Sequence, residues 1–288
     1  MSDLVSLLFQ TDAFKICKEN EPFWYTSGKI GPYFVNTQFL YGSEKDSKDL
    51  LDFIDSELEN SEKSVIPSHI FTKVWEQYEN NEIFKKVINT LKDYATTNVD
   101  LSKIDYISGG ERRDWFFSNI LAHLLNKPHI TIFKDLSVIE SSSDFQSSKQ
   151  VENFENKNVL HVADLLNTAS SYERAWIPAL RALNANIVAS IVIVDRMQGG
   201  SQILAELGVQ SLSLLQIDEA LFQKAKELGI INDVQLDMLH DYTANPDETM
   251  RNFLTNHPEF LENALNSDNA KTVKRAKACV EQDLYQLN

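Results

Sequence analysis

Cysteine is scarce in this sequence, and long apolar runs are missing altogether. Its 288 residues include two cysteines, Cys17 and Cys279, which lie far apart and fit no metal-binding spacing. This usage is typical of a reduced, cytoplasmic protein. No run of about 18 apolar residues is present, so we expect no transmembrane helix. The first residues lack the basic segment and cleavage site of a secretory signal, which also favours a cytoplasmic location.

Basic residues are also few relative to acidic ones. Lys and Arg number 27 against 42 Asp and Glu, which gives a formal net charge of −15. Such a charge opposes binding to a nucleic-acid backbone or to an anionic membrane. A phosphorylated small molecule remains a compatible ligand, because local arginines and backbone N–H groups can override the overall field. We therefore expect a small-molecule substrate, with no nucleic acid and no membrane as partner.

The middle of the sequence alternates between short apolar runs and helical patterns. Candidate strands are 104–108, 129–133, 159–162, 187–194 and 209–215, and the candidate helices between them are 115–125, 171–183 and 201–207. This alternation predicts an α/β fold, a doubly wound parallel sheet with helices on both faces. Ligands of such sheets bind at the carboxyl ends of the strands. The turns after Ser108, Ala163 and Val194 should therefore lie at the binding edge.

Helical patterns flank this alternation on both sides. Residues 12–24 are predicted as a helix, and apolar stripes predict a helical insertion over about 44–95. Residues 216–288 are predicted to be wholly helical, with an amphipathic packing face. We thus expect an α/β domain over 1–215 and a helical C-terminal extension over 216–288. The polar stretch 137–156 has a length that suits a lid.

The segment from Val159 to Ser171 combines the features of a phosphate site. A short apolar strand ends near Asp164, and small polar residues then lead into a helical pattern. Backbone N–H groups at the start of a helix, together with the helix dipole, favour a bound anion. The aspartate could hold a sugar hydroxyl or approach a hydrated Mg²⁺. An ordinary strand–turn–helix unit has the same pattern, with Ser170 or Ser171 as a plain helix cap and Asp164 as a turn acid.

Three segments match the motifs of one enzyme family in the same order. VLHVADLLNTASS (159–171) resembles the signature for phosphoribosyl pyrophosphate (PRPP) in type I phosphoribosyltransferases. YTSGKIGPYFVN (25–36) and VIVDRMQGG (192–200) resemble two motifs of the orotate phosphoribosyltransferase branch. The resemblance spans residues 10–215 or thereabouts. It implies the phosphoribosyltransferase-like fold and an enzyme of pyrimidine nucleotide metabolism that transfers phosphoribosyl from PRPP to a nitrogenous base.

The resemblance assigns the two phosphate-bearing ends of PRPP to two turns. The 5-phosphate would lie on Asn167, Thr168, Ala169, Ser170 and Ser171, and the pyrophosphate on Gly109, Gly110, Arg112 and Arg113. Glycines allow the backbone to approach a ligand closely, and arginines can grip phosphate oxygens in bidentate fashion. Alternatively, both arginines form ion pairs with Glu111 and Asp114 on a solvated helix end.

The same resemblance assigns the chemistry and the base. Asp164 and Lys134 match catalytic positions, and the base would be bound by Lys29, Phe34 and Arg196. Alternatively, Lys29 is a solvated turn lysine and Arg196 is a partner of Asp195. Mg²⁺ would be carried by PRPP, and no metal site of the protein itself is expected, because the six histidines show no metal-ligand spacing. The resemblance also implies a homodimer.

Several positions depart from the family pattern. Ala163 replaces the first of two adjacent acids that hold the ribose hydroxyls, and Ala169 replaces a glycine. Asn167 replaces a threonine that touches the base, and the cationic cluster of the mobile loop is reduced to Lys134. We therefore predict slow or acceptor-shifted phosphoribosyl transfer. The alternative is a non-catalytic protein on the same fold that senses PRPP or a nucleotide.

Overall fold

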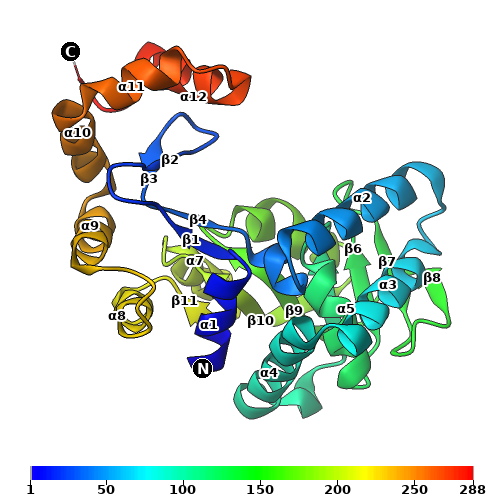
Figure 1. Cartoon of the computed structure of the whole chain (residues 1–288). Coiled ribbons are helices and arrows are strands. Elements are labelled where there is room, and N and C mark those ends of the chain that lie inside the picture. The colour runs from blue at the N-terminus through cyan, green and yellow to red at the C-terminus, as the bar shows by residue number, and fades with distance from the viewer. Residues whose placement is uncertain (1, 288) are drawn as a thin grey trace. The chain divides into compact units, whose positions relative to one another are not determined.

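The computed structural model describes residues 2–287, which form two compact units (Figure 1). The first unit contains the chain up to Ala13 together with Thr37–Asp218. The second contains Phe14–Asn36 and the C-terminal part from Glu219 onward. This grouping differs from the expected division in one respect. Residues 14–36 were expected within the α/β domain, whereas here they pack with the C-terminal helices.

A seven-stranded sheet forms the centre of the first unit, in the order β11-β10-β9-β5-β6-β7-β8 (Figure 1). Its strands are β5 (Tyr106–Gly110), β6 (His129–Ile132), β7 (Val138–Ser141), β8 (Ser148–Gln150), β9 (Lys157–Leu166), β10 (Ala185–Asp195) and β11 (Gln210–Gln216). Neighbouring strands from β11 to β6 pair in parallel, whereas β7 and β8 pair antiparallel. The predicted α/β class is confirmed, and all five predicted strands are present.

The order of the strands places a reversal at the middle of the sheet. Strand β9 pairs with β10 on one side and with β5 on the other. The chain runs outward from β5 to β6 in one direction, and from β9 through β10 to β11 in the opposite direction. Open parallel sheets bind ligands outside the carboxyl ends of their strands at such a reversal. The fold therefore predicts a ligand site at the carboxyl ends of β5 and β9.

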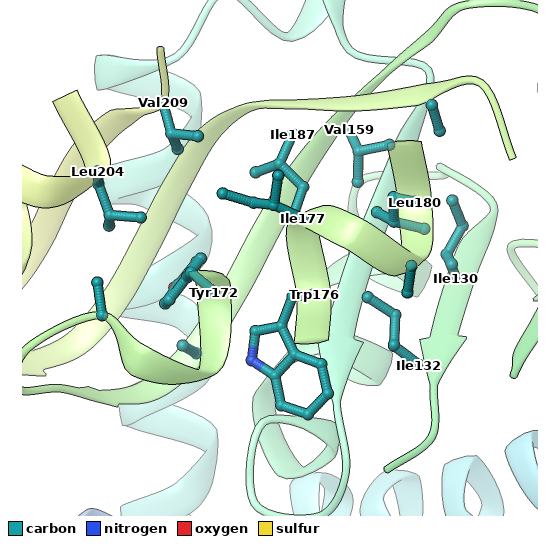
Figure 2. Packing of buried hydrophobic residues seen from close by; sticks show 14 of the residues in the cluster. Ile130, Ile132, Val159, Tyr172, Trp176, Ile177, Leu180, Ile187, Leu204 and Val209 are labelled. Carbon is teal, nitrogen blue, oxygen red and sulfur yellow. The ribbon is translucent and has the colours of Figure 1, made fainter. Parts of the chain in front are cut away.

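Helices connect the parallel strands and cover the sheet. Helix α5 (Trp115–Leu124) joins β5 to β6, and α7 (Gly200–Glu206) joins β10 to β11. Between β9 and β10, a π-helical turn, η3 (Tyr172–Trp176), continues into α6 (Ile177–Arg181). Right-handed crossovers that run in opposite directions put α5 and α6 on opposite faces. Figure 2 shows Trp176 and Leu180 of this segment with sheet residues such as Val159 in one buried cluster.

The expected helical insertion consists of α2 (Glu44–Asn60), α3 (Ile66–Asn80) and α4 (Glu82–Asn98). Ser43 begins α2 by accepting a hydrogen bond from the Asp46 N–H (3.0 Å). Asn81 begins α4 by accepting from the N–H groups of Ile83 and Phe84 (3.0 Å each). Such caps satisfy donors that the first helical turn leaves unpaired. The remaining elements of this unit are α1 (Ser2–Gln10), η1 (Thr37–Tyr41) and η2 (Leu101–Lys103).

The second unit combines two small two-stranded sheets with five helices. Strand β1 (Phe14–Ile16) pairs with β4 (Tyr33–Val35), and β2 (Phe23–Trp24) pairs with β3 (Ile30–Gly31), both antiparallel. The helices are α8 (Glu219–Glu227), α9 (Asp233–Ala244), α10 (Pro246–Asn256), α11 (Pro258–Leu265) and α12 (Ala270–Glu281), which confirms the helical C-terminal part. No helix within residues 2–287 is long and apolar enough to span a membrane.

Two predictions of secondary structure are wrong. Residues 12–24 form strands instead of a helix, because Phe14–Ile16 finds a cross-strand partner in Tyr33–Val35, which local periodicity cannot reveal. The polar stretch 137–156, where no strand was predicted, is not a simple loop. It adds β7 and β8 to the sheet as a hairpin, with Val138 and Ile139 buried. A short polar strand at the edge of a sheet has too weak a pattern to be distinguished from a loop.

Candidate active site

A pocket of about 160 Å³ lies where β5 and β9 end. Two segments far apart in the sequence line it, together with Trp176. They are 111–114, which follows β5, and 163–172, which comprises the end of β9 and the turn after it. The first contains part of the turn assigned to pyrophosphate, and the second contains the whole turn assigned to the 5-phosphate. The pocket thus brings these two predicted turns to one place, at the strand reversal where α/β sheets bind ligands.

The turn after β9 has one unusual backbone position. Ala169 has φ of +53°, a left-handed conformation that a side chain disfavours and that glycine adopts freely. Helical hydrogen bonding begins immediately after it, since the Glu173 N–H donates to the Ala169 carbonyl (3.1 Å). Alanine therefore adopts the glycine-type backbone that the sequence comparison implied for this position. The N–H groups of the residues that follow are those of a first helical turn, which have no partners within the helix.

Asp164 lies at the buried end of the pocket, with its side chain 9% exposed. Its carboxylate accepts a hydrogen bond from the Thr37 hydroxyl (3.2 Å) and lies 3.4 Å from Arg113 Nε. Burial raises the pKa of Asp164 to about 6, because desolvation and the nearby Asp114 outweigh the opposing effect of Arg113. The carboxyl therefore keeps its proton to a higher pH than an exposed aspartate does.

The two glycines after β5 fit closely against the protein around them. A methyl group on Gly110 would come within 2.4 Å of the Trp176 indole, and one on Gly109 within 2.2 Å of the Ser118 hydroxyl. The Trp115 indole N–H donates to the Gly109 carbonyl (3.0 Å). The next peptide bond, Glu111–Arg112, is cis. Glycine is thus required here for packing inside the protein, whichever ligand the pocket takes.

Both arginines of this turn form ion pairs, but with carboxylates other than the expected ones. Arg112 pairs with Asp55 of α2, and Arg113 pairs with Asp164. Arg113 also donates to the side-chain oxygen of Gln38 (3.1 Å). Both side chains stay partly exposed, Arg113 at 43%. The Arg112–Asp55 pair is largely exposed and therefore weak, so Arg112 can exchange its partner for a phosphate at little cost. Arg113 pairs with a buried carboxylate, so its release requires another partner for Asp164.

Glu111, an expected partner of the arginines, instead contacts the end of β6. Its carboxylate accepts a hydrogen bond from the Lys134 N–H (3.0 Å) and lies 3.3 Å from Lys134 Nζ. The lysine side chain is 66% exposed. Glu111 lines the pocket, so Lys134 is held beside the pocket by this one acidic residue.

The residues assigned to the base belong to different units. In the second unit, Lys29 Nζ lies 2.7 Å from Asp247 of α10, and the Phe34 ring packs 5.0 Å from Phe23. The Lys29 side chain is 41% exposed, so its pair with Asp247 is compatible with the alternative of a solvated turn lysine. In the first unit, Arg196 follows β10, and its N–H donates to the Leu166 carbonyl (2.9 Å).

The buried Asp195 accepts a hydrogen bond from the Met197 N–H (2.8 Å), and burial raises the pKa of its carboxyl. Asp195 thus holds the turn that carries Arg196.

Sequence reasoning missed two side chains beside the pocket. Asp114 was considered only as a partner of the arginines, yet its carboxylate accepts from two backbone N–H groups, those of Gly110 and Asp164. Thr37, which holds Asp164, precedes the helical insertion and carries no sequence signal. Across residues 2–287, no group of three or more His, Cys, Asp or Glu side chains is arranged to hold a metal ion.

Comparison with known proteins supports the resemblance found in the sequence motifs. No protein-family model matches the chain. Among curated proteins, the orotate phosphoribosyltransferase of Staphylothermus marinus is 23% identical over 218 residues, which cover 75% of this chain and 82% of that protein.

Solved structures show which fold the chain has. UMP synthase of Leishmania donovani matches 84% of this chain with a TM-score of 0.56 at 16% identity, and the chain spans 41% of that protein. Orotate phosphoribosyltransferase of Aeropyrum pernix matches 78% of this chain and 99% of its own, with a TM-score of 0.50 at 18% identity. Orotate phosphoribosyltransferase of Francisella tularensis matches 83% of this chain and 96% of its own, with a TM-score of 0.53 at 15% identity. The phosphoribosyltransferase-like fold implied by the motifs is confirmed.

Proposed function

We propose that this protein is a phosphoribosyltransferase of the orotate type, which transfers phosphoribosyl from PRPP to a nitrogenous base. The observation that carries the proposal is the pocket at the ends of β5 and β9. Two turns that resemble different parts of a PRPP site, about 50 residues apart in the sequence, line the same pocket. The curated relative and the solved structures of the same fold support the same activity.

In this proposal each end of PRPP has its own set of donors. The backbone N–H groups and hydroxyls of 167–171 would bind the 5-phosphate, and Asp164 would accept hydrogen bonds from the ribose hydroxyls. Arg112 and Arg113 would leave Asp55 and Asp164 to bind the pyrophosphate, beside the backbone of Gly109 and Gly110. Because Arg113 now pairs with Asp164, ligand binding would replace the carboxylate beside Arg113 by pyrophosphate and the guanidinium beside Asp164 by ribose hydroxyls.

The reaction forms a bond between a base nitrogen and ribose C1, and it breaks the bond from C1 to pyrophosphate. The bonding electron pair leaves with pyrophosphate, and the attacking nitrogen loses its proton. Positive charge develops on the ribose while negative charge develops on the leaving group. Lys134, exposed at the end of β6, would neutralise part of the latter charge. Mg²⁺, carried by PRPP, would neutralise more of it when bound.

The base would contact Lys29, Phe34 and Arg196, and this assignment is best tested one residue at a time. A cationic side chain suits an anionic base because it can pair with a carboxylate. Lys29→Met should weaken orotate binding in the presence of pyrophosphate and ribose 5-phosphate. Lys45→Met is a matched control, because Lys45 is likewise an exposed lysine paired with an aspartate, Asp49. Equal effects of the two substitutions would contradict the assignment of Lys29.

The test of the activity is the steady-state release of pyrophosphate from PRPP with orotate and a panel of other bases. We expect turnover well below the ~10 per second that is usual for enzymes, because Ala163 and the reduced loop cations remove charge-assisted contacts. Turnover at the usual rate would show that these departures are harmless. No turnover with any base, together with tight PRPP binding, would make the protein a sensor of PRPP or of a nucleotide.

The test of the phosphate turn is calorimetry with ribose 5-phosphate. Ser170→Glu should weaken binding at least tenfold, because it places a negative charge among the donors. Ser68→Glu is the control, because Ser68 is also a serine in a first helical turn, that of α3, away from the pocket. Unchanged affinity in Ser170→Glu would contradict the proposal for this turn.

Analytical ultracentrifugation tests the proposed homodimer, and cell fractionation tests the proposed cytoplasmic location.

A further inference from the structure

One carboxylate connects the two turns that line the pocket. Asp114 Oδ2 accepts a hydrogen bond from the Gly110 N–H (3.0 Å), and Asp114 Oδ1 accepts one from the Asp164 N–H (2.9 Å). The side chain is 10% exposed, so these are buried hydrogen bonds to a charged acceptor. Such bonds are about twice as strong as those between neutral groups. Gly110 ends β5 and Asp164 lies near the end of β9, two neighbouring strands.

A second buried polar side chain, that of His161, lies beside Asp114. His161 Nε2 lies 3.6 Å from Asp114 Oδ2, and within the described part of the chain it has no hydrogen-bond partner. On its other side, His161 Nδ1 lies 2.8 Å from the Ser108 hydroxyl. Asp114 Oδ2 thus has the Gly110 N–H as a close donor and His161 Nε2 farther away at 3.6 Å.

We propose that Asp114 is a positioning residue that holds both turns in the shape needed for pyrophosphate and ribose. The inference rests on the proposed function, because it concerns how that pocket accommodates its ligand. Asp114 contacts backbone N–H groups of both turns, so the relative placement of Gly110 and Asp164 depends on one side chain. Removing it should change the pocket without removing any group that binds the ligand.

A carboxylate beside a pyrophosphate site has two effects of opposite sign. Its negative charge repels pyrophosphate, so a neutral residue of the same shape should bind the anion more tightly if charge alone mattered. If Asp114 positions the turns, the same replacement should weaken binding. Asp114 also raises the pKa of Asp164, so affinities are measured at about pH 8, where Asp164 is ionised with or without the Asp114 charge. At that pH the direction of the change in affinity separates a positioning role from a bystander charge.

Asp114→Asn is the informative variant, because asparagine keeps the shape but has only one acceptor oxygen. The amide NH₂ can face His161 Nε2, which would leave the Gly110 N–H without an acceptor. We expect hydrogen exchange at the Gly110 amide to accelerate at least tenfold, and the dissociation constant for inorganic pyrophosphate to rise about tenfold.

Asp105→Asn is the matched control. The Asp105 carboxylate also accepts from a backbone N–H of the β9 region, that of Asn158 (2.9 Å), but at the opposite end of the sheet. This variant should accelerate exchange only near Asn158 and leave pyrophosphate affinity unchanged.

The outcomes separate this inference from the proposed function. If the unsubstituted protein binds neither PRPP nor pyrophosphate, the proposed function is wrong, and hydrogen exchange alone decides the role of Asp114. Unchanged exchange at both Gly110 and Asp164 in Asp114→Asn overturns the inference, and so does tighter pyrophosphate binding. If Asp114→Asn does not fold, amide hydrogen exchange in the unsubstituted protein tests the role of Asp114. The Gly110 and Asp164 amides should then exchange at least a hundredfold more slowly than the same amides in an unstructured chain of the same sequence, and fast exchange overturns the inference.

Discussion

Arg113 Nε lies 3.4 Å from the carboxylate of Asp164, so the turn after β5 and the turn after β9 are joined by an ion pair at the pocket. The arginine is 43% exposed and the aspartate 9%. The pair is therefore accessible from the arginine side only. A phosphorylated ligand could reach the guanidinium without first uncovering the carboxylate, which makes this pair a natural point of exchange on binding.

The first prediction concerns the pH dependence of stability. Desolvation raises the pKa of Asp164 to about 6, above its value of 3.8 in an unfolded chain. The folded state therefore favours the protonated carboxyl, and its free energy of unfolding should fall as pH rises from about 4 to about 6. This one group should account for up to about 3 kcal/mol of that fall. Urea unfolding at several pH values measures it.

Asp164→Asn is the control for this prediction, because the amide does not titrate. The free energy of unfolding of the variant should therefore vary much less with pH between about pH 4 and about pH 6 than that of the unsubstituted protein. The same pH dependence in the variant and in the unsubstituted protein would show that other groups cause it.

The second prediction concerns the missing acid. Ala163 is buried and lines the pocket beside Asp164. Ala163→Asp should destabilise the fold by about 2–4 kcal/mol, because it buries a second carboxylate next to the first. It should nevertheless strengthen ribose 5-phosphate binding, since it restores an acceptor for ribose hydroxyls. Chemical denaturation and calorimetry measure the two effects, and a variant that is destabilised without tighter binding would contradict the alignment of this position.

The third prediction concerns the backbone of the phosphate turn. Ala169 has φ of +53°, so Ala169→Gly should remove backbone strain of about 1 kcal/mol. The same substitution loses the burial of a methyl group, which is worth a similar amount, so the free energy of unfolding should change by less than about 1 kcal/mol. Ala169→Val should cost more than about 2 kcal/mol, because a β-branched side chain is poorly tolerated at positive φ. Thermal unfolding of the pair is the measurement. A valine variant as stable as the glycine variant would argue against the left-handed conformation.

The fourth prediction concerns the second unit. The buried Tyr285 hydroxyl accepts a hydrogen bond from the Ile30 N–H (2.8 Å) and donates to the Ile30 carbonyl (3.3 Å). Tyr285→Phe should leave that N–H buried without a partner and destabilise the protein by about 1–3 kcal/mol. Tyr94→Phe, at a half-buried tyrosine of α4, should change stability by less than about 0.5 kcal/mol. Equal effects would show that the hydrogen bond contributes little.

The sequence by itself determined the elements whose pattern is local. Strands such as β9 and β10 contain short apolar runs, and helices such as α4 have regular apolar stripes, so their residues specify both the element and its buried face. The doubly wound sheet follows from their alternation, and the two turns at its carboxyl edge follow from the sheet. Ala169 was recognisable as a departure because the motif expects glycine there.

The tertiary structure decided everything that depends on partners distant in the sequence. Phe14–Ile16 becomes a strand only because Tyr33–Val35 pairs with it. The arginines of the pocket form ion pairs with Asp55 and Asp164, although Glu111 and Asp114 are closer to them in the sequence. Likewise, Asp114 accepts from amides of both turns only after β5 and β9 pair in their observed register. Local periodicity reports which face of an element is buried. Ion pairs, hydrogen bonds and pKa shifts depend on which charges the completed fold places within a few ångströms of one another.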